Sequence, residues 1–481
     1  MALVARDGSQ SARRLLIALL AAAAGWMAWL AVYQVDDAFI VYRYARSLAR
    51  GDGFVFNAGE RVEGVTCFLW TLVLAPFSAA GVPLPRVAPV LTAIAGLSCL
   101  VLVARRHAES EGRVGLELRD LLPVTLLAVA PAFAYWSVGA LETVPYALVL
   151  TLAARGHARE RRGADGLASA VSLGVAGLLR PETPLIVAAF IGPFLLFRRL
   201  YFGSWLPNTY YAKAGAPFPV LIARGWTYMR GCLASTMPAF GGASGAIVLL
   251  GALVVALLLA FAWRRPELRT EAIVVLAVAA AVVAEGGDWM VLCRFWVPAL
   301  PCLAVIAGAA LVRLSSWHRA GTAAAVLCVA AVIASGLTTG ARERNGGRGL
   351  LVNAVGYRHA HREVARFLNE HASAGDAVAL MDVGMIGWEA DRLRVIDITG
   401  LTDRDIAHAP GDFLDKRFPV ADLLARDPRF MVLVPGFPAD GRIFADPAFR
   451  SRYRALFSVD HRFNWQPPST YKLCVFERNA P

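Results

Sequence analysis

Ten apolar runs, most of them long enough to cross a lipid bilayer, constrain this sequence more than any other feature. A transmembrane helix needs about 20 mostly apolar residues. The 481-residue chain is 57% hydrophobic, and its mean hydropathy is +0.53. The sequence therefore predicts a polytopic α-helical membrane protein with about 9–11 transmembrane helices. The runs lie near residues 15–33, 87–104, 121–137, 143–155, 166–179, 184–200, 244–263, 271–285, 294–313 and 320–338.

Basic residues between these runs predict the orientation, because cytoplasmic loops of membrane proteins carry an excess of Lys and Arg. If the basic loops are cytoplasmic, the number of crossings is odd, and both the loop 35–66 and the C-terminus face the periplasm of a bacterial inner membrane. Segment 67–81 would break this pattern by crossing, so we expect it to lie in the interface or to re-enter. The basic loops are at residues 13–14, 105–107, 155–162, 264–265 and 313–319.

The net charge of +12 fits such loops and accompanies no nucleic-acid recognition motif, so nucleic-acid binding is not expected. Seven scattered cysteines without a CxxC pair indicate neither a zinc site nor a disulfide framework.

The composition changes after residue 338. Residues 339–481 contain no run that could cross a membrane, and a helix is expected over 357–373. Short β runs are expected at DAVALM, LRVIDI, RFMVLVP and YKLCVFE. We therefore predict a transmembrane domain, 1–338, followed by a soluble extracytoplasmic α/β domain, 339–481.

Two adjacent carboxylates, Asp36 and Asp37, follow the first apolar run. Charges beside hydrocarbon cost several kcal/mol unless they face water, a partner or an ion, which makes such acids functional candidates. The alternative is that they only mark the end of the span. The next residues predict a helix in the membrane interface, with Arg43 on its basic face, that ends at Gly51.

Further polar residues are expected on the same outer side if this orientation is correct. Each could be an ordinary solvated loop residue. Together they supply carboxylates for proton and hydroxyl handling, cations for phosphate and aromatic rings for sugar faces. The set is Glu60, Glu63, Glu142, Arg180, Glu182, Asn208, Tyr210, Tyr211, Lys213, Asp288 and Arg294.

Several motifs in chain order resemble those of the membrane-embedded GT-C glycosyltransferases. They are the DD pair, GDGFVFN with GERVEG, LLRPE, LPNTYYAK, GGDW with RF, and VIDITGLTD. The resemblance is to the AftB-like arabinofuranosyltransferases and to bacterial proteins labelled ZomB. It implies a polyprenyl-phosphate sugar donor and a catalytic base directly after the first span, which here is Asp36 with Asp37 beside it. The chain departs from the pattern between LLRPE and LPNTYYAK, where about 25 residues leave too little room for the two crossings expected there.

These residue types suit glycosyl transfer, in which an acceptor hydroxyl is deprotonated and a leaving phosphate gains charge. Asp36 is the candidate base, while Asp37 either orients the acceptor or ligates a divalent cation, Mg²⁺ or Mn²⁺. Arg43, Lys213 and Arg294 are candidates for the lipid phosphate. Direct displacement without an enzyme nucleophile would invert the configuration of the sugar.

The residues alone leave other functions open. A transporter could use the acid pair for proton or ion coupling, and a structural or regulatory membrane protein, linked by one family label to flagella, is a third class. For an enzyme, the expected partners are a polyprenyl-phosphate sugar, a cell-envelope glycan or glycolipid acceptor, and membrane lipid. Arabinofuranose follows only from the resemblance, and mannose or another hexose is equally open.

Overall fold

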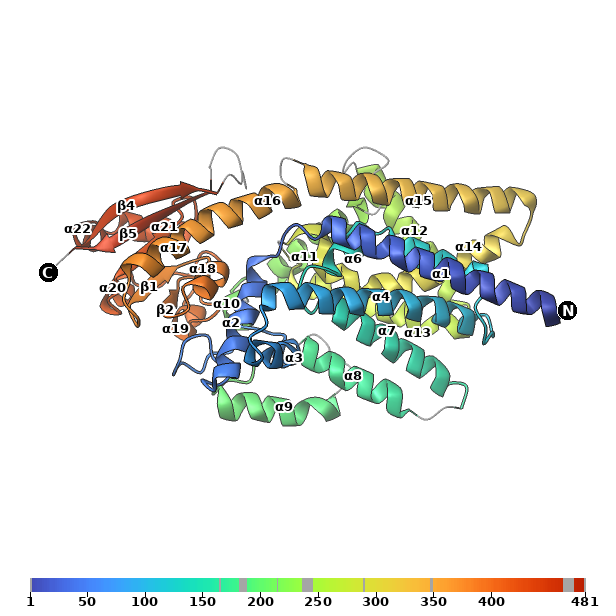
Figure 1. Cartoon of the computed structure of the whole chain (residues 1–481), viewed down its shortest axis with the longest axis horizontal. Coiled ribbons are helices and arrows are strands. Elements are labelled where there is room, and N and C mark those ends of the chain that lie inside the picture. The colour runs from blue at the N-terminus through green and yellow to red at the C-terminus, as the bar shows by residue number, and fades with distance from the viewer. Residues whose placement is uncertain are drawn as a thin grey trace. The chain divides into compact units, whose positions relative to one another are not determined.

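The computed structural model describes residues 2–163, 166–180, 188–213, 215–235, 245–288, 290–346, 349–461 and 471–479. The chain divides into two compact units, each assembled from three stretches of sequence (Figure 1). The helical unit comprises Met1–Ala31, Ala88–Val187 and Phe218–Arg344. The mixed unit comprises Val32–Val87, Ala188–Pro217 and Asn345–Pro481. The loop 35–66 therefore folds together with the C-terminal α/β domain.

The helical unit is a bundle of apolar helices. Among the residues described, four helices are long and apolar enough to cross a membrane: Ser9–Leu30, Leu84–Ser110, Val291–Ser315 and Arg319–His371. The predicted membrane class is confirmed, and the exact number of crossings stays a prediction. The helices are α1 (Ala2–Leu30), α4 (Leu84–Ser110), η1 (Leu118–Asp120), α5 (Leu121–Ala128), α6 (Pro131–Trp136), α7 (Thr143–Glu160), α8 (Leu167–Leu179), α11 (Phe218–Ser235), α12 (Gly245–Trp263), η4 (Pro266–Leu268), α13 (Arg269–Glu285), η5 (Val291–Ala299), α14 (Leu300–Ser315) and α15 (Arg319–Asn345).

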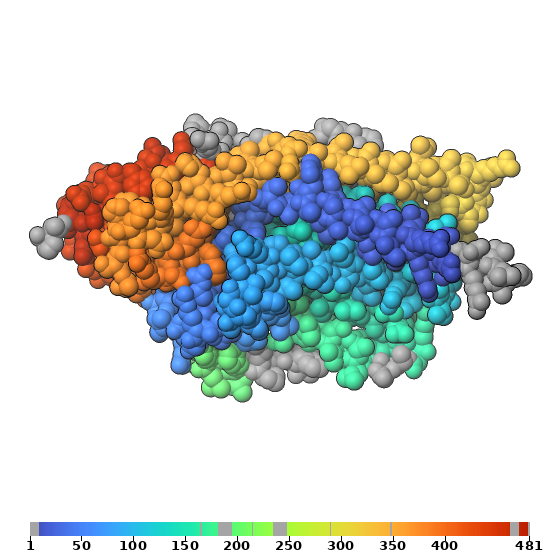
Figure 2. Space-filling model, in the orientation of Figure 1, coloured from blue at the N-terminus to red at the C-terminus, as the bar shows by residue number. Residues whose placement is uncertain are grey.

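Large apolar side chains point outward from this bundle. Ile17 on α1 is 67% exposed and Leu327 on α15 is 69% exposed, and both helices lie at the surface of the face shown in Figure 2. Such an exterior suits lipid contact, because hydrocarbon does not penalise exposed apolar groups.

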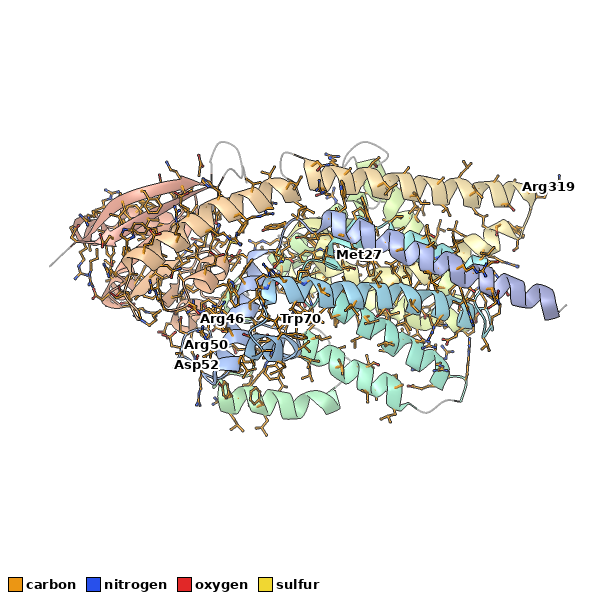
Figure 3. The ribbon with its side chains drawn as sticks, viewed as in Figure 1. Met27, Arg46, Arg50, Asp52, Trp70 and Arg319 are labelled. Carbon is orange, nitrogen blue, oxygen red and sulfur yellow. The ribbon has the colours of Figure 1, made fainter. Side chains whose placement is uncertain are left out.

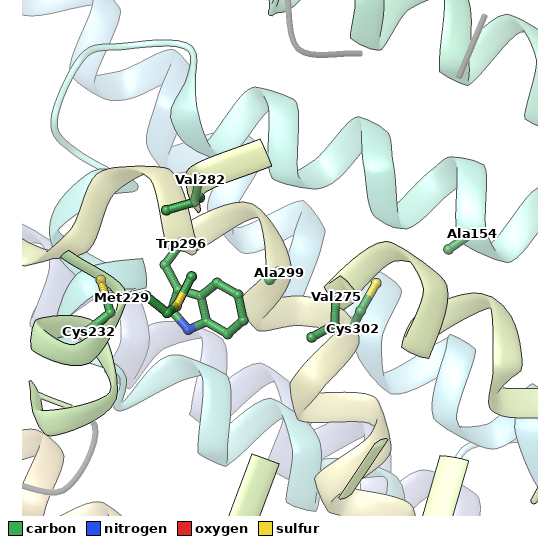
Figure 4. Close-up of a cluster of buried hydrophobic side chains, with 8 residues drawn as sticks. All are labelled: Ala154, Met229, Cys232, Val275, Val282, Trp296, Ala299 and Cys302. Carbon is green, nitrogen blue, oxygen red and sulfur yellow. The ribbon is translucent and has the colours of Figure 1, made fainter. Parts of the chain in front are cut away.

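The interior of the helical unit is organised around Trp296. This side chain is 4% exposed and packs in a cluster with Met229, Val282 and Ala299, so that α11, α13 and η5 share one core (Figure 4). The same cluster contains three small buried residues at its periphery, Ala154, Val275 and Cys302.

A five-stranded sheet forms the centre of the C-terminal part of the mixed unit (Figure 1). Its order is β2-β1-β3-β5-β4. β1 pairs in parallel with β2 and β3, while β5 pairs antiparallel with β3 and β4. β1 and β3 are buried throughout, as expected for apolar strands between two neighbours. The strands are β1 (Ala377–Leu380), β2 (Arg394–Asp397), β3 (Phe430–Leu433), β4 (Tyr453–Asp460) and β5 (Lys472–Arg478).

The four predicted strands are confirmed as β1, β2, β3 and β5, and the predicted helix at 357–373 is confirmed as η6 followed by α17. β4 was not predicted. The helices of the mixed unit are α2 (Asp36–Arg50), α3 (Phe68–Ala79), α9 (Ala188–Tyr201), α10 (Asn208–Lys213), α16 (Leu350–Gly356), η6 (Tyr357–His361), α17 (Arg362–His371), α18 (Val383–Glu389), α19 (Arg404–His408), α20 (Val420–Ala425), α21 (Pro438–Ala445) and α22 (Pro447–Arg452).

Helix α2 ends as predicted at Gly51, whose φ of 86° closes the helix in the left-handed region. Its interfacial position stays a prediction. Within the protein, α2 is packed on nearly all sides, with every residue from 38 to 45 buried against partners that include α3 and α18. The predicted basic face is not free, because its arginines pair with protein groups. Arg46 and Arg50 each lie 2.8 Å from Asp391.

Helix α3 occupies the segment expected not to cross. At about 1.5 Å per residue its 12 residues span about 18 Å, well short of the hydrocarbon core of about 30 Å. Trp70 anchors α3 in the mixed unit with 4% exposure (Figure 3).

Candidate functional site

Asp36, the predicted base, begins α2 and is 8% exposed. Its Oδ1 accepts the backbone N–H of Met385 at 2.7 Å, and its Oδ2 accepts that of Gly384 at 2.9 Å. Both donors lie in the first turn of α18, where a Cβ in place of the glycine hydrogen would collide with the Asp36 carboxylate. The carboxylate is therefore held in one position by the backbone of the C-terminal domain.

Burial and, to a smaller extent, the negative charge of Asp382 raise the pKa of Asp36 to about 7, against the opposing effects of His361 and the two amide hydrogen bonds. A general base works best when its pKa lies near the operating pH. The environment thus makes Asp36 a stronger base than an exposed aspartate. Asp37 lies beside it, half-buried.

A second group of buried or half-buried polar side chains in the mixed unit, which we call the Asp382 group, was not predicted. Asp382 Oδ2 accepts the hydroxyl of Tyr471 and lies 3.0 Å from His361 Nε2. The ring of His461 lies 5.2 Å from that of His361. Asp440 accepts the Val434 N–H, and burial raises the pKa of Asp440 to about 8. The sequence contained one signal for Asp382. This residue closely follows the parallel strand β1, and functional side chains of α/β sheets gather at the carboxyl ends of such strands.

Three of the sequence motifs meet at the turn after β2. Asp397 organises this turn by accepting the backbone N–H and the hydroxyl of both Thr399 and Thr402. Asn208 of LPNTYYAK donates its side-chain amide to the carbonyls of Gly400 at 2.7 Å and Leu401 at 3.0 Å. The Asn208 backbone N–H also donates to the carbonyl of residue 63, in GERVEG, at 2.9 Å. The buried Asn208 therefore links the turn after β2 to the GERVEG segment.

Arg43 has surroundings that do not support phosphate binding. It is 4% exposed, and its guanidinium donates to the carbonyls of Phe56, Gly387 and Leu393 and to the side chain of Asn57, at 2.6–3.2 Å. The prediction that Arg43 binds the donor phosphate is therefore replaced by a structural role. Its charge satisfies backbone carbonyls inside the mixed unit.

Glu63 is also internal, with 2% exposure, and its Oε1 accepts from Arg198 Nε at 3.1 Å and Nη2 at 3.0 Å. Burial raises the pKa of Glu63 to about 7, against the pull of Arg198.

The remaining predicted residues of the mixed unit lie nearer its surface. Tyr210 is 52% exposed. The ring of Tyr211 lies 4.3 Å from that of His408, and the exposed Lys213 lies 5.4 Å from the Phe413 ring.

Four predicted residues come together in the helical unit. Glu142 is 1% exposed, and its Oε1 lies 2.8 Å from Arg294 Nη2 and 3.1 Å from Arg180 Nη2. Asp288 Oδ2 lies 3.9 Å from Arg294 Nη1, and Thr143 Oγ1 accepts from Arg294 Nε at 3.2 Å. We call Glu142, Arg180, Asp288 and Arg294 the charged cluster. Glu182 was predicted beside them and lies outside the described residues.

Unusual backbone surrounds the charged cluster. Ala140, Leu292 and Cys293 have φ values of 66°, 58° and 49°, in the left-handed region that side chains other than glycine rarely adopt. Such conformations cost about 1–3 kcal/mol each and concentrate at functional sites. They lie within two residues of Glu142 and Arg294, so the fold accepts local strain where these two side chains are positioned.

An apolar cavity begins at the charged cluster. It has a volume of about 250 Å³ and is lined by α7, α8, α13 and η5. Arg180 and Phe295 line one end, with the guanidinium 4.8 Å from the aromatic ring, and His157 and Thr270 line the other. Along α7 the lining runs from Tyr146 to His157, about 16 Å. The lining also includes Glu285, and its remaining residues are mostly apolar, so the cavity suits a hydrocarbon chain that begins beside a polar group.

Two solved structures share the fold of this chain over most of its length. One is ArnT from Cupriavidus metallidurans bound to undecaprenyl phosphate, matched over 96% of this chain and 97% of that chain, with a TM-score of 0.55 and 13% identity. The whole chain has the GT-C glycosyltransferase fold. A second GT-C structure is the archaeal oligosaccharyltransferase AglB from Archaeoglobus fulgidus, in complex with an inhibitory peptide and a dolichol-phosphate. It matches 98% of this chain and 74% of that chain, with a TM-score of 0.50 and 12% identity.

Sequence similarity to known enzymes is confined to short stretches. Terminal β-(1→2)-arabinofuranosyltransferases of Mycobacterium tuberculosis and Corynebacterium glutamicum are 48% identical over 50 residues and 51% identical over 45 residues. These matches span 8% and 7% of the length of the two relatives, and 10% and 9% of this chain. A family model described as a domain of unknown function, DUF8728, matches residues 352–476, which contain the sheet and the Asp382 group.

The predicted divalent cation finds few ligands among the described residues. Within the described residues, no group of three or more His, Cys, Asp or Glu side chains could hold a metal ion. Both Asp36 oxygens already accept backbone N–H groups. Around Asp37, the described part of the chain forms no complete metal site.

Proposed function

We propose that this protein is a membrane glycosyltransferase that moves a sugar from a polyprenyl-phosphate donor to a cell-envelope glycan or glycolipid. The observation that carries this proposal is the charged cluster at the end of an apolar cavity, in a chain with the GT-C fold. The alternative of an ion transporter has less support, because this cavity is lined mostly by apolar side chains, whereas an ion path needs polar ones.

Arg180 and Arg294 supply the positive charge for the donor phosphate. A guanidinium binds phosphate oxygens bidentately, and Glu142 between the two arginines fixes their orientation. The cavity beside Arg180 accepts the first part of the polyprenyl chain. The carriers named with ArnT and AglB, undecaprenyl phosphate and dolichol-phosphate, have this same combination of phosphate and long hydrocarbon. Lys213, on the mixed unit, remains a weaker candidate because it is exposed.

Asp36 acts as the base that removes the proton from the acceptor hydroxyl. Its pKa, raised by burial to about 7, lies near neutral pH, where a general base works best. Direct attack of the acceptor on the anomeric carbon breaks the bond to the donor phosphate, the configuration inverts, and the leaving phosphate takes the negative charge. Asp37 orients the acceptor.

The donor sugar is arabinofuranose, a choice that rests on the two short matches to arabinofuranosyltransferases. The active site and the C-terminal domain face the periplasm, where sugars arrive on lipid carriers and nucleotide sugars are not supplied.

Purified protein assayed with polyprenyl-phosphate arabinofuranose tests this function. Arg294→Ala should raise KM about tenfold and lower kcat, because the charge of the leaving group grows in the transition state. Arg294→Lys should restore only part of the activity, since the bidentate fork is lost.

Arg105→Ala, which removes an exposed arginine at the other end of the helical unit, is the matched control and should behave as wild type. Efficient transfer from a soluble nucleotide sugar, or unchanged kinetics of Arg294→Ala, would contradict the proposed donor.

A further inference from the structure

The helical unit contains a second pocket, at the end of α7 opposite the charged cluster. It is lined by Ser110 and Glu111 at the end of α4, by Arg161 and Arg162 after α7, and by Arg265 and Glu267 before α13. Its volume is about 510 Å³. We call these six residues the basic pocket.

The basic pocket and the charged cluster are separated by about the thickness of a membrane. Glu142 directly precedes α7 and Arg161 directly follows it, so the 18 residues of the helix place them about 27 Å apart. The hydrocarbon core of a bilayer is about 30 Å thick. If one site lies at the level of the lipid head groups on one side, the other lies at that level on the opposite side.

The carboxylates near the basic pocket are mostly paired with other arginines. Glu109 accepts from Arg155 at 2.6 Å, and the buried Glu271 accepts from Arg106 at 2.5 Å. Asp120 accepts from Arg113 at 2.6 Å through each oxygen. Each of these carboxylates is therefore paired with an arginine that does not line the pocket.

The arginines of the pocket itself are less well neutralised. Glu111 and Glu267 lie 3.6 Å and 3.9 Å from Arg265. Arg161 and Arg162 are exposed, and each donates to a backbone carbonyl, that of Pro266 at 3.0 Å and that of Glu109 at 2.8 Å. Within the described part of the chain, neither has a carboxylate at ion-pair distance. Two adjacent guanidinium groups therefore remain available to an anion.

Phosphate is the anion that this arrangement suits. A guanidinium presents a planar fork of N–H donors that matches two phosphate oxygens, and basic pockets between transmembrane helices bind the head groups of anionic lipids. Apolar surface lies close by, because the cavity along α7 ends at His157, next to Ala158 in the wall of the basic pocket. A ligand with hydrocarbon chains fits this setting better than a small soluble anion.

We propose that the basic pocket binds the phosphate head group of an anionic phospholipid, at the membrane face opposite the charged cluster. This site goes beyond the proposed function and does not depend on it, since it lies on the other side of the bilayer from the donor phosphate. Its occupation would fasten the ends of α4, α7 and η4 to one another.

The proposal is tested by thermal unfolding of the full-length protein in a zwitterionic detergent, titrated with phosphatidylglycerol. The midpoint should rise saturably with this lipid and not with phosphatidylcholine of the same acyl chains. The double variant Arg161→Gln, Arg162→Gln should bind phosphatidylglycerol about ten times more weakly, the expected loss for charge-assisted hydrogen bonds. Both residues are exposed, so the variant should unfold at the wild-type midpoint without lipid.

A charge-matched control separates the pocket from general surface charge. Arg105→Gln with Arg159→Gln removes two exposed arginines from the same end of the unit without touching the pocket lining, and should bind as wild type does. Equal affinity of the pocket variant and wild type, an equal loss in the control, or an equal response to phosphatidylcholine would each overturn the site. A full midpoint shift with millimolar inorganic phosphate alone would identify a soluble anion as the ligand and overturn the lipid assignment.

Discussion

The two units use their polar residues in opposite ways. In the mixed unit, Arg43 and Asn208 point inward and donate to backbone carbonyls, so these two predicted site residues hold segments of the chain together. In the helical unit, Glu142, Arg180 and Arg294 bind one another beside an apolar cavity. A polar motif in a membrane protein can therefore serve the fold as readily as the chemistry, and only its partners distinguish the two.

The largest effect that would sharpen this comparison is expected for Asp36→Asn. Removing a general base should lower kcat about a thousandfold. Asparagine also replaces one of the two acceptor oxygens by an N–H₂ group facing a backbone N–H, which should cost about 1–3 kcal/mol of stability. Radiolabelled sugar transfer and thermal unfolding measure the two effects separately.

Asp52→Asn makes the same change of charge at an exposed position of the same unit, is the matched control and should turn over as wild type does. Normal turnover in Asp36→Asn, with only a loss of stability, would show that Asp36 has a structural role and is not the catalytic base.

Arg43→Met should act on stability instead of donor binding. The variant leaves several buried carbonyls without a donor, and we expect a loss of about 3–5 kcal/mol in unfolding free energy. The KM of the folded fraction for the lipid donor should stay at the wild-type value, in contrast to Arg294→Ala. A stable Arg43 variant with a raised KM would show that Arg43 binds the donor. The two units would then use their polar residues in the same way.

The fold was more predictable than the site because burial follows patterns that are visible along the chain. Apolar runs marked the membrane helices, and continuous apolar strands marked β1 and β3. β4 was missed because it is an edge strand, in which five residues from Arg454 to Ser458 are exposed or half-buried, so no alternation is visible.

The acid pair and the members of the charged cluster were found because charged residues are rare in an apolar sequence. The partners of Asp36 could not be found in this way. Gly384 and Met385 contribute backbone N–H groups, which every residue carries, and they lie almost 350 positions further along the chain. The structural role of Arg43 could not be predicted for the same reason, because its partners are mainly backbone carbonyls.

A smaller effect is expected from Asp440→Asn, which tests how a buried carboxyl group changes the stability of the mixed unit with pH. Asp440 ionises near pH 4 when unfolded, but its pKa is about 8 in the fold, so the unfolded chain loses its proton first. Stability should therefore fall as pH rises from about 4 to about 8. The variant should reduce this slope and be more stable than wild type at pH 8, by about 1 kcal/mol or more, since each pKa unit is worth about 1.4 kcal/mol.

Thermal midpoints at pH 5 and pH 8 measure the difference. Asp36 contributes a slope of the same sign up to about pH 7, so the variant should keep part of the dependence. An identical slope in both proteins would show that Asp440 does not ionise in this range.

The smallest effect is expected from chelation. Because the described residues supply no metal site around Asp37, EDTA should change kcat by less than about twofold. A strong loss restored by Mg²⁺ or Mn²⁺ would give the acid pair a metal-binding role and make the mixed unit more than a scaffold for one base.

The contact between Asn57 and β2 has a consequence for how the chain avoids self-association. β2 lies at the edge of the sheet, and the Asn57 side chain donates to the Val395 carbonyl at 2.8 Å and accepts the Val395 N–H at 3.1 Å, as a neighbouring strand would. An uncovered edge is a template for strand pairing between molecules. Asn57 thus acts as a short strand substitute, and chains whose loop fails to dock during synthesis would present β2 to one another as an aggregation site.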